Sequence, residues 1–178
     1  GMEIRAVGGT VPAMELLGAV THSMPMSEAY LALDQGLVDG ILASNDTLEG
    51  FRLAEVVDYV TKTPFLYNVV FMKIMNLDTW NSLPADIQAV FEELNDEFAL
   101  EYGRLRAQYT ISGLEYGIET HGLEVIELSA EEDQLWRGTI APVTEEWTAR
   151  ISERGLPGQE VVDIVRELDA KYADMYPN

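Results

Sequence analysis

Short runs of β-forming residues alternate with short helical runs along the first third of the chain. Strands are predicted at three places: 3–7, 21–26 and 38–42. Helices are predicted between them, over 12–19 and 28–35. Pro12 suits a first helical turn, Ser27 is the expected N-cap of the second helix, and Gly36 is its expected stop. Because the connections are short, this alternation predicts an α/β layer with a mainly parallel sheet.

The middle of the chain carries its longest helical pattern. Three elements are predicted ahead of it: a helix over 48–55 and β-rich runs over 56–65 and 67–74. From Pro84 to Gly122, apolar residues recur at spacings of three, four or seven, which predicts one helix. Some 36 residues would reach roughly 55 Å, longer than a small domain is wide, so the helix is expected to cross between lobes or project. Three glycines are its possible bend points: Gly103, Gly113 and Gly117.

Clear boundary signals mark the last third of the chain. A strand is predicted over 123–128, and Ser129 and Glu132 have the spacing of a capping box, which predicts a helix that runs to about Glu153. Pro157 and the glycine after it then separate this helix from a last amphipathic one.

Composition narrows the classes of function. Of the 178 residues 47% are hydrophobic, and no run of 18 apolar residues occurs, so a globular protein without a membrane span is expected. The start at Gly1 lacks the features of a signal peptide, so we expect mature or truncated material. With 31 acidic against 11 basic residues the formal charge is -20, which makes nucleic acid a poor partner. The absence of cysteine excludes disulfides and thiolate chemistry.

Motifs of catalysis, cofactor binding and metal binding are missing from the sequence. The two histidines, His22 and His121, lie far apart without metal-ligand spacing, so structural or surface roles are expected. No Walker A, GxGxxG or GxSxG pattern occurs, and no carboxylate pair stands out among the many acids. We therefore predict no catalytic residue, no cofactor and no metal.

Arg5 is the most informative single residue. It is the only basic residue before Arg52, and it lies in a strand expected to be buried, ahead of a glycine turn and a helix start. A guanidinium can hold a carboxylate through two parallel hydrogen bonds, so a carboxylate ligand is one interpretation. The other is a structural ion pair with an internal acid such as Asp39 or Asp46.

Two further places in the sequence are candidates for contact with a ligand. Ser44 and Asn45 follow a strand's carboxyl end, where open α/β sheets place ligands, although an ordinary turn explains them equally well. Met26, like Met24, Phe51 and Phe65, is a core residue by default.

Several segments match a known family in order along the chain. Residues 25–40, PMSEAYLALDQGLVDG, resemble the signature P-x-S-E-x-Y-x-A-L-Q-x-G-x-V-D-G of the solute-binding proteins of TRAP transporters, with Asp34 in place of glutamine. Three further segments are similar to the family. Residues 1–5 match its G-[LM]-K-[IL]-R strand, residues 75–88 match the segment that opens its long helix, and residues 122–129 match a later strand. Members are considerably longer, so the chain resembles the C-terminal part of one.

The resemblance implies a fold and a site. The fold is α/β and two-lobed, like periplasmic binding proteins, represented here by the C-terminal lobe, a long lobe-crossing helix and C-terminal helices. Three parts are expected: 1–66 as part of the ligand-binding lobe, 67–110 as a strand and the long helix, and 111–178 as the return to the C-terminal lobe. In the family the arginine that matches Arg5 binds the ligand carboxylate. Met26 takes a position that packs near the ligand. Where many relatives carry an E-N-P or E-G-P motif, this chain has Ser44 and Asn45, similar to a subgroup with a small hydroxyl-rich loop.

The function implied by this resemblance is transport in the periplasm. The chain is expected to bind a small organic carboxylate, of unspecified identity, and to deliver it to TRAP membrane subunits without being an enzyme. One alternative is a small α/β enzyme that acts on carboxylic acids, with Asp46 or Glu49 as its base. Another is an acidic interaction domain without a ligand, which an exposed Arg5 would favour. Because the chain resembles part of a longer protein, association or element exchange between copies is also expected.

Overall fold

Two small parallel sheets organise the chain, of which the computed structural model describes residues 1–67 and 71–172. The first sheet has the order β2-β1-β3 and consists of β1 (Glu3–Arg5), β2 (Val20–His22) and β3 (Gly40–Ile41). The second pairs β4 (Tyr59–Lys62) with β5 (Glu124–Glu127). All of these pairings are parallel, which confirms the predicted α/β class.

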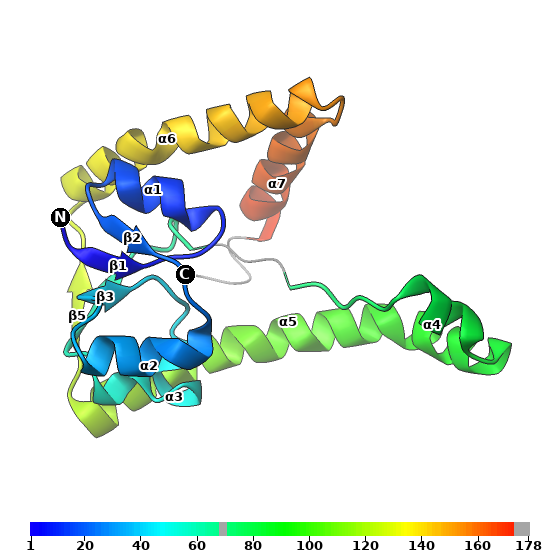
Figure 1. Cartoon of the computed structure of the whole chain (residues 1–178), viewed down its shortest axis with the longest axis horizontal. Helices are drawn as coiled ribbons and strands as arrows, with labels where there is room; N and C mark the ends of the chain where they lie inside the picture. The colour runs from blue at the N-terminus through cyan, green and yellow to red at the C-terminus, as the bar shows by residue number, and fades with distance from the viewer. Residues whose placement is uncertain (68–70, 173–178) are drawn as a thin grey trace.

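Helices cover both faces of the first sheet (Figure 1). They are α1 (Thr10–Leu16), α2 (Met26–Asp34), α3 (Asp46–Gly50), α4 (Leu77–Ser82), α5 (Ala85–His121), α6 (Ala130–Glu153) and α7 (Gly158–Tyr172), with a 3₁₀ turn η1 (Leu53–Glu55). Helices α1 and α6 contact each other on one side, whereas α3 packs against the end of α5 on the other.

Local chain signals account for most of these boundaries. The capping box of Ser129 and Glu132 is present at the start of α6, and Gly36 follows α2 with a φ of +67°. Gly122 ends α5 with a φ of +72°, a left-handed conformation that glycine adopts without steric penalty. These three predictions are confirmed.

Other boundaries differ from the predictions. Helix α2 begins at Met26 with Pro25 as its N-cap, so the prediction that Ser27 caps it is wrong. The helix predicted over 48–55 is broken, because Arg52 has a φ of +59° between α3 and η1. Of the strand predicted over 67–74, residues 71–74 have no regular structure and 68–70 lie outside the described residues.

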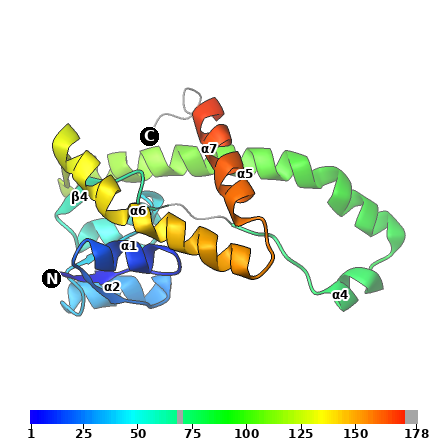
Figure 2. The same cartoon turned by 90° about the horizontal axis from the view of Figure 1, so that it is seen from above.

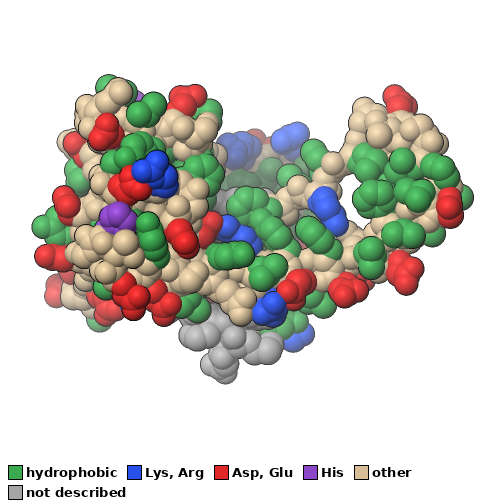
Figure 3. Space-filling model, turned by 90° about the horizontal axis from the view of Figure 1, so that it is seen from below, with side chains coloured by type: hydrophobic (Ala, Val, Ile, Leu, Met, Phe, Trp, Pro, Cys, Tyr) green, Lys and Arg blue, Asp and Glu red, His purple; other side chains and the backbone are tan. Residues whose placement is uncertain are grey.

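Helix α5 is a single element of 37 residues, and its glycines do not break it. It begins beside α4, and its first part projects from the α/β body, as both views show (Figures 1 and 2). We call α4 together with residues 85–101 of α5 the arm. Large apolar side chains are exposed along it, among them Leu77, Ile87, Val90, Phe91, Leu94 and Phe98. Seen from below, hydrophobic side chains gather over this end of the molecule (Figure 3).

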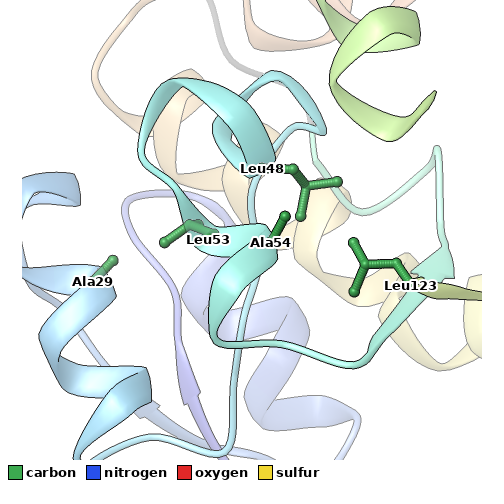
Figure 4. Close-up of a cluster of buried hydrophobic side chains, with 5 residues drawn as sticks. All are labelled: Ala29, Leu48, Leu53, Ala54 and Leu123. Atoms are coloured by element: carbon green, nitrogen blue, oxygen red, sulfur yellow. The ribbon is translucent and has the colours of Figure 1, made fainter. Parts of the chain in front are cut away.

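A small buried cluster joins α2, α3, η1 and the short link between α5 and β5 (Figure 4). Its members are Ala29, Leu48, Leu53, Ala54 and Leu123. Leu53 is 1% exposed, and complete burial of a leucine side chain stabilises the folded state by about 1.5–3 kcal/mol. Leu114 of α5 packs against the same cluster, so the end of the long helix is fixed beside α3 and the loop before it.

Candidate functional site

The sequence-predicted site residues lie at the carboxyl ends of the first sheet's strands. Arg5 is the last residue of β1 and is aligned with His22 of β2 and Ile41 of β3. Met26 opens α2 just after β2, and Ser44 and Asn45 stand between β3 and α3. This edge is where open α/β sheets bind ligands, so the fold brings the four residues to one side of the sheet.

Arg5 is a buried cation with spare hydrogen-bond donors. Its side chain is 4% exposed, and its Nε and Nη2 donate to the carbonyl oxygen of Met24 at 3.1 and 2.9 Å. Nη1 is buried and has no hydrogen-bond partner among the described residues. Burial lowers the pKa of Arg5, and the nearby Tyr67 acts in the opposite direction. An arginine starts from so high a pKa that the group stays charged at neutral pH.

No internal acid neutralises Arg5 in the described part of the chain. The carboxylate of Asp39 accepts from the backbone N–H of Glu3 at 2.8 Å, and Asp46 pairs with Arg106. The interpretation of Arg5 as the partner of Asp39 or Asp46 is therefore wrong. A buried guanidinium with unused donors instead favours an anion that comes from outside these residues.

The loop before α3 is held by hydrogen bonds of its own and by the long helix. The Ser44 hydroxyl donates to Asp46, and it accepts from Nη2 of Arg106 at 3.1 Å. The Ser44 carbonyl accepts from the Thr47 hydroxyl at 2.6 Å. Asn45 is the N-cap residue of α3, but its side chain makes no capping bond, so its amide is free of that role.

Arg106 was not predicted. It lies 60 residues after Asp46 in sequence, and in α5 it resembles any other charged residue on a helix face. The only sequence signal that marks it is the pair of glycines seven and eleven residues later, Gly113 and Gly117, which places all three on one stripe of the helix.

Met26 and the two histidines have largely structural surroundings. Met26 is partly buried and packs against the apolar cluster. His22 bonds to Glu3, and His121 bonds to the Tyr116 hydroxyl at 3.2 Å. Within residues 1–67 and 71–172, no group of three acidic or histidine side chains could hold a metal ion.

A cleft of about 820 Å³ lies between the two sheets. Ser44 and Asn45 line it with residues of β3 and β4, and Trp136 of α6 contributes as well. Arg5 and Met26 are not among its lining residues, so the structure places the four site residues near one sheet edge but not around one common cavity. None of the helices in the described ranges has the length and apolar character needed to cross a membrane.

Comparison with known proteins identifies the family. Residues 1–150 match the sequence profile of the family described as bacterial extracellular solute-binding protein, family 7 (DctP). The C4-dicarboxylate-binding periplasmic protein DctP of Rhodobacter capsulatus is 28% identical over 173 residues, which cover 96% of this chain and 50% of that protein.

Solved structures agree with this assignment. A TRAP periplasmic solute binding protein from Desulfovibrio salexigens is 31% identical with a TM-score of 0.76, over 97% of this chain and 54% of that one. One from Rhodoferax ferrireducens, in complex with copurified benzoate, has a TM-score of 0.85 at 22% identity, over 98% and 56%. The chain thus spans about half the length of the relatives it matches. With a family match over most of its residues and a fold shared with TRAP solute-binding proteins, the chain belongs to bacterial extracellular solute-binding protein family 7.

Proposed function

We propose that the chain binds a small organic carboxylate through Arg5, as part of the periplasmic solute-binding component of a TRAP transporter. One observation carries the proposal: Arg5 is almost fully buried, and its Nη1 has no hydrogen-bond partner among the described residues. A carboxylate oxygen at Nη1 would supply the missing acceptor and a compensating charge.

The ligands of structural relatives agree in chemistry with this proposal. The neighbours include proteins with bound mandelate, L-malate, succinate and benzoate. All four ligands carry a carboxylate, but they differ in size and in the number of charges. The carboxylate is the one chemical group that they share, and a guanidinium such as that of Arg5 can bind it through two parallel hydrogen bonds.

The other three predicted site residues supply candidate contacts for the remainder of a ligand. The Asn45 amide offers one donor pair and one acceptor without a capping role, and Met26 offers a soft apolar contact. We assign Asn45 to hydrogen bonding and Met26 to apolar contact, and we assign Ser44 the role of an acceptor only, because its hydroxyl already donates to Asp46. No bond need be made or broken. Closure around the ligand would then present the surface that the membrane subunits recognise.

The two alternative functions have weaker support. An interaction domain without a ligand is favoured by an exposed Arg5, whereas Arg5 is buried. For an enzyme, Asp46 is a poor base because Arg106 and the Ser44 hydroxyl already occupy its carboxylate, and Glu49 is exposed at the surface.

The test is a thermal-shift screen against mono- and dicarboxylic acids, followed by calorimetry. It is run on this chain and on a longer protein that contains it, because a site that lacks part of its lining binds its ligand weakly. Ligand at 100 times its Kd stabilises the folded state by about 2.7 kcal/mol. Stabilisation by carboxylates but not by their amides supports the proposal. If no acid shifts the melting temperature of either protein, the proposal fails, and turnover of an acid would support the enzyme instead.

A further inference from the structure

Four residues from distant parts of the chain meet where α5 passes the loop before α3. The Arg106 guanidinium pairs with the Asp46 carboxylate, and it also donates to the Ser44 hydroxyl at 3.1 Å. Its carbon Cζ lies 5.1 Å from the ring centre of Phe71. The side chains of Arg106 and Asp46 are 28% and 17% exposed, so the pair is partly shielded from water. We call Ser44, Asp46, Phe71 and Arg106 the Arg106 cluster.

The same stripe of α5 touches the loop's backbone two turns later. A Cβ atom at Gly113 would lie 2.4 Å from the carbonyl oxygen of Asn45 and 2.8 Å from the Cα of Asp46. The helix and the loop can therefore approach this closely only because position 113 has no side chain. Residues 44–46 are held by α5 at two points, a charged one at Arg106 and a close backbone contact at Gly113.

We propose that Arg106 is a positioning residue that sets the conformation of the ligand loop, residues 42–45, through Asp46 and Ser44. This inference rests on the proposed function for the role of the loop, but not for the contact itself. Arg106 does not bind the ligand. Its guanidinium is occupied by Asp46, Ser44 and Phe71, in contrast to Arg5, whose Nη1 is unpaired among the described residues.

Hydrogen bonds connect Arg106 to the loop and to the start of α3. Asp46 accepts a hydrogen bond from the Ser44 hydroxyl, and Arg106 donates to the same hydroxyl oxygen, so the two groups together fix the Ser44 rotamer. The neighbouring Asn45 carbonyl accepts from the backbone N–H of Leu48 at 3.0 Å, which couples the loop to the first turn of α3. Loss of Arg106 would leave Asp46 partly buried and without its cation, and the loop would have to open toward water.

A matched pair of variants tests the proposal. Arg106→Gln removes the contact, and Arg104→Gln removes an arginine of the same helix that pairs with Glu101 and is 52% exposed. Hydrogen exchange of the Thr47 and Leu48 amides, which bond to Ser44 and Asn45, reports on the loop without ligand. The Ala6 amide, bonded to His22 in the sheet, is the internal reference. Calorimetric titration with succinate and with benzoate, at a temperature far below the melting temperature, measures the Kd of carboxylate binding.

Arg106→Gln is expected to speed Thr47 and Leu48 exchange at least tenfold relative to Ala6, and to raise the Kd about tenfold, whereas Arg104→Gln changes neither by more than twofold. Asp46→Asn should act alike, and the double variant Arg106→Gln, Asp46→Asn should be no worse than either single variant.

If both arginine variants behave alike, the proposal is overturned. If the loop exchanges faster but the wild-type protein binds no acid, the positioning role stands and the proposed function fails. A lower melting temperature with unchanged Kd makes Arg106 structural only.

Discussion

At the residue scale, two arginines approach the same edge of the sheet with different surroundings. Arg5 is buried, and its hydrogen-bond acceptor is a backbone carbonyl, so its positive charge has no counterion among the described residues. Arg106 has a carboxylate, a hydroxyl and an aromatic ring around it. A cation without a counterion can bind an incoming anion, whereas a neutralised one can only orient its neighbours. The difference in role follows from the partners and not from the residue type.

Arg5 provides the most direct test of the carboxylate site. Arg5→Ala is expected to lower carboxylate affinity at least tenfold, about 1.4 kcal/mol, and Arg5→Lys almost as much, because an ammonium cannot form the two parallel bonds of a guanidinium. Calorimetric titration measures both. An unchanged Kd for Arg5→Ala would remove Arg5 from the site.

Asn45 tests the loop separately from the clamp. Because its side chain has no capping role, Asn45→Ala should weaken binding by about 1–2 kcal/mol while the melting temperature without ligand stays nearly constant. Titration and thermal melts are run side by side. Equal losses in both measurements would mean that the loop has a structural role.

Sequence reasoning singled out Arg5, whose role as a ligand residue stays a prediction, but could not single out Arg106. An isolated basic residue in an apolar strand is conspicuous, since burial of a charge requires a reason. Arg106 is one of several charged residues on a long helix, and its contact with Asp46 depends on how α5 packs on α3. Sixty residues separate the two partners, so no local pattern predicts the pair.

At the element scale, boundaries set by neighbouring residues were predicted correctly, whereas features set by long-range packing were not predicted. The capping box at Ser129 and the stop at Gly122 depend on residues within one turn, and both are confirmed. The left-handed backbone at Arg52 breaks the helix predicted over 48–55, and residues 71–74 lack the predicted strand, so the predictions at these residues are wrong. The glycines of α5 were interpreted as possible bend points, whereas the helix is continuous and Gly113 allows close packing against the loop.

The two kinds of glycine in α5 give a matched experiment. Gly113→Ala should destabilise the fold by about 1–3 kcal/mol, because the new Cβ would meet Asn45 and Asp46 at less than 3 Å. Gly103→Ala has open space within 4 Å of its Cβ and should stabilise the helix by up to about 1 kcal/mol. Urea midpoints decide between them. If Gly113→Ala is as stable as Gly103→Ala, the close packing of α5 on the loop is not tight in solution.

At the scale of the whole molecule, the arm stands out because no other described part of the chain covers its apolar surface. The first part of α5 projects from the α/β body (Figure 1), and large apolar side chains along it are exposed to solvent (Figure 3). Contiguous exposed apolar surface of this kind is usually covered by another protein surface. Since the chain spans about half the length of its relatives, the arm is also the place where their additional residues could pack.

We therefore expect the isolated chain to associate through the arm. Ile87, Val90 and Leu94 lie three and four residues apart on one face of α5 and are 41–50% exposed, so replacing all three with glutamine keeps a good helix former and removes the apolar surface. A matched control replaces three comparably exposed leucines of the α/β body: Leu16, Leu31 and Leu37. Light scattering over a range of concentrations should show dimers or larger species for the wild type and the control, and monomers for the arm variant. Because burial of apolar area drives association, the effect should also persist at high salt, where interactions between acidic surfaces are screened. A wild-type chain that stays monomeric at every concentration would contradict the prediction, and association that survives in the arm variant would place the interface on another surface.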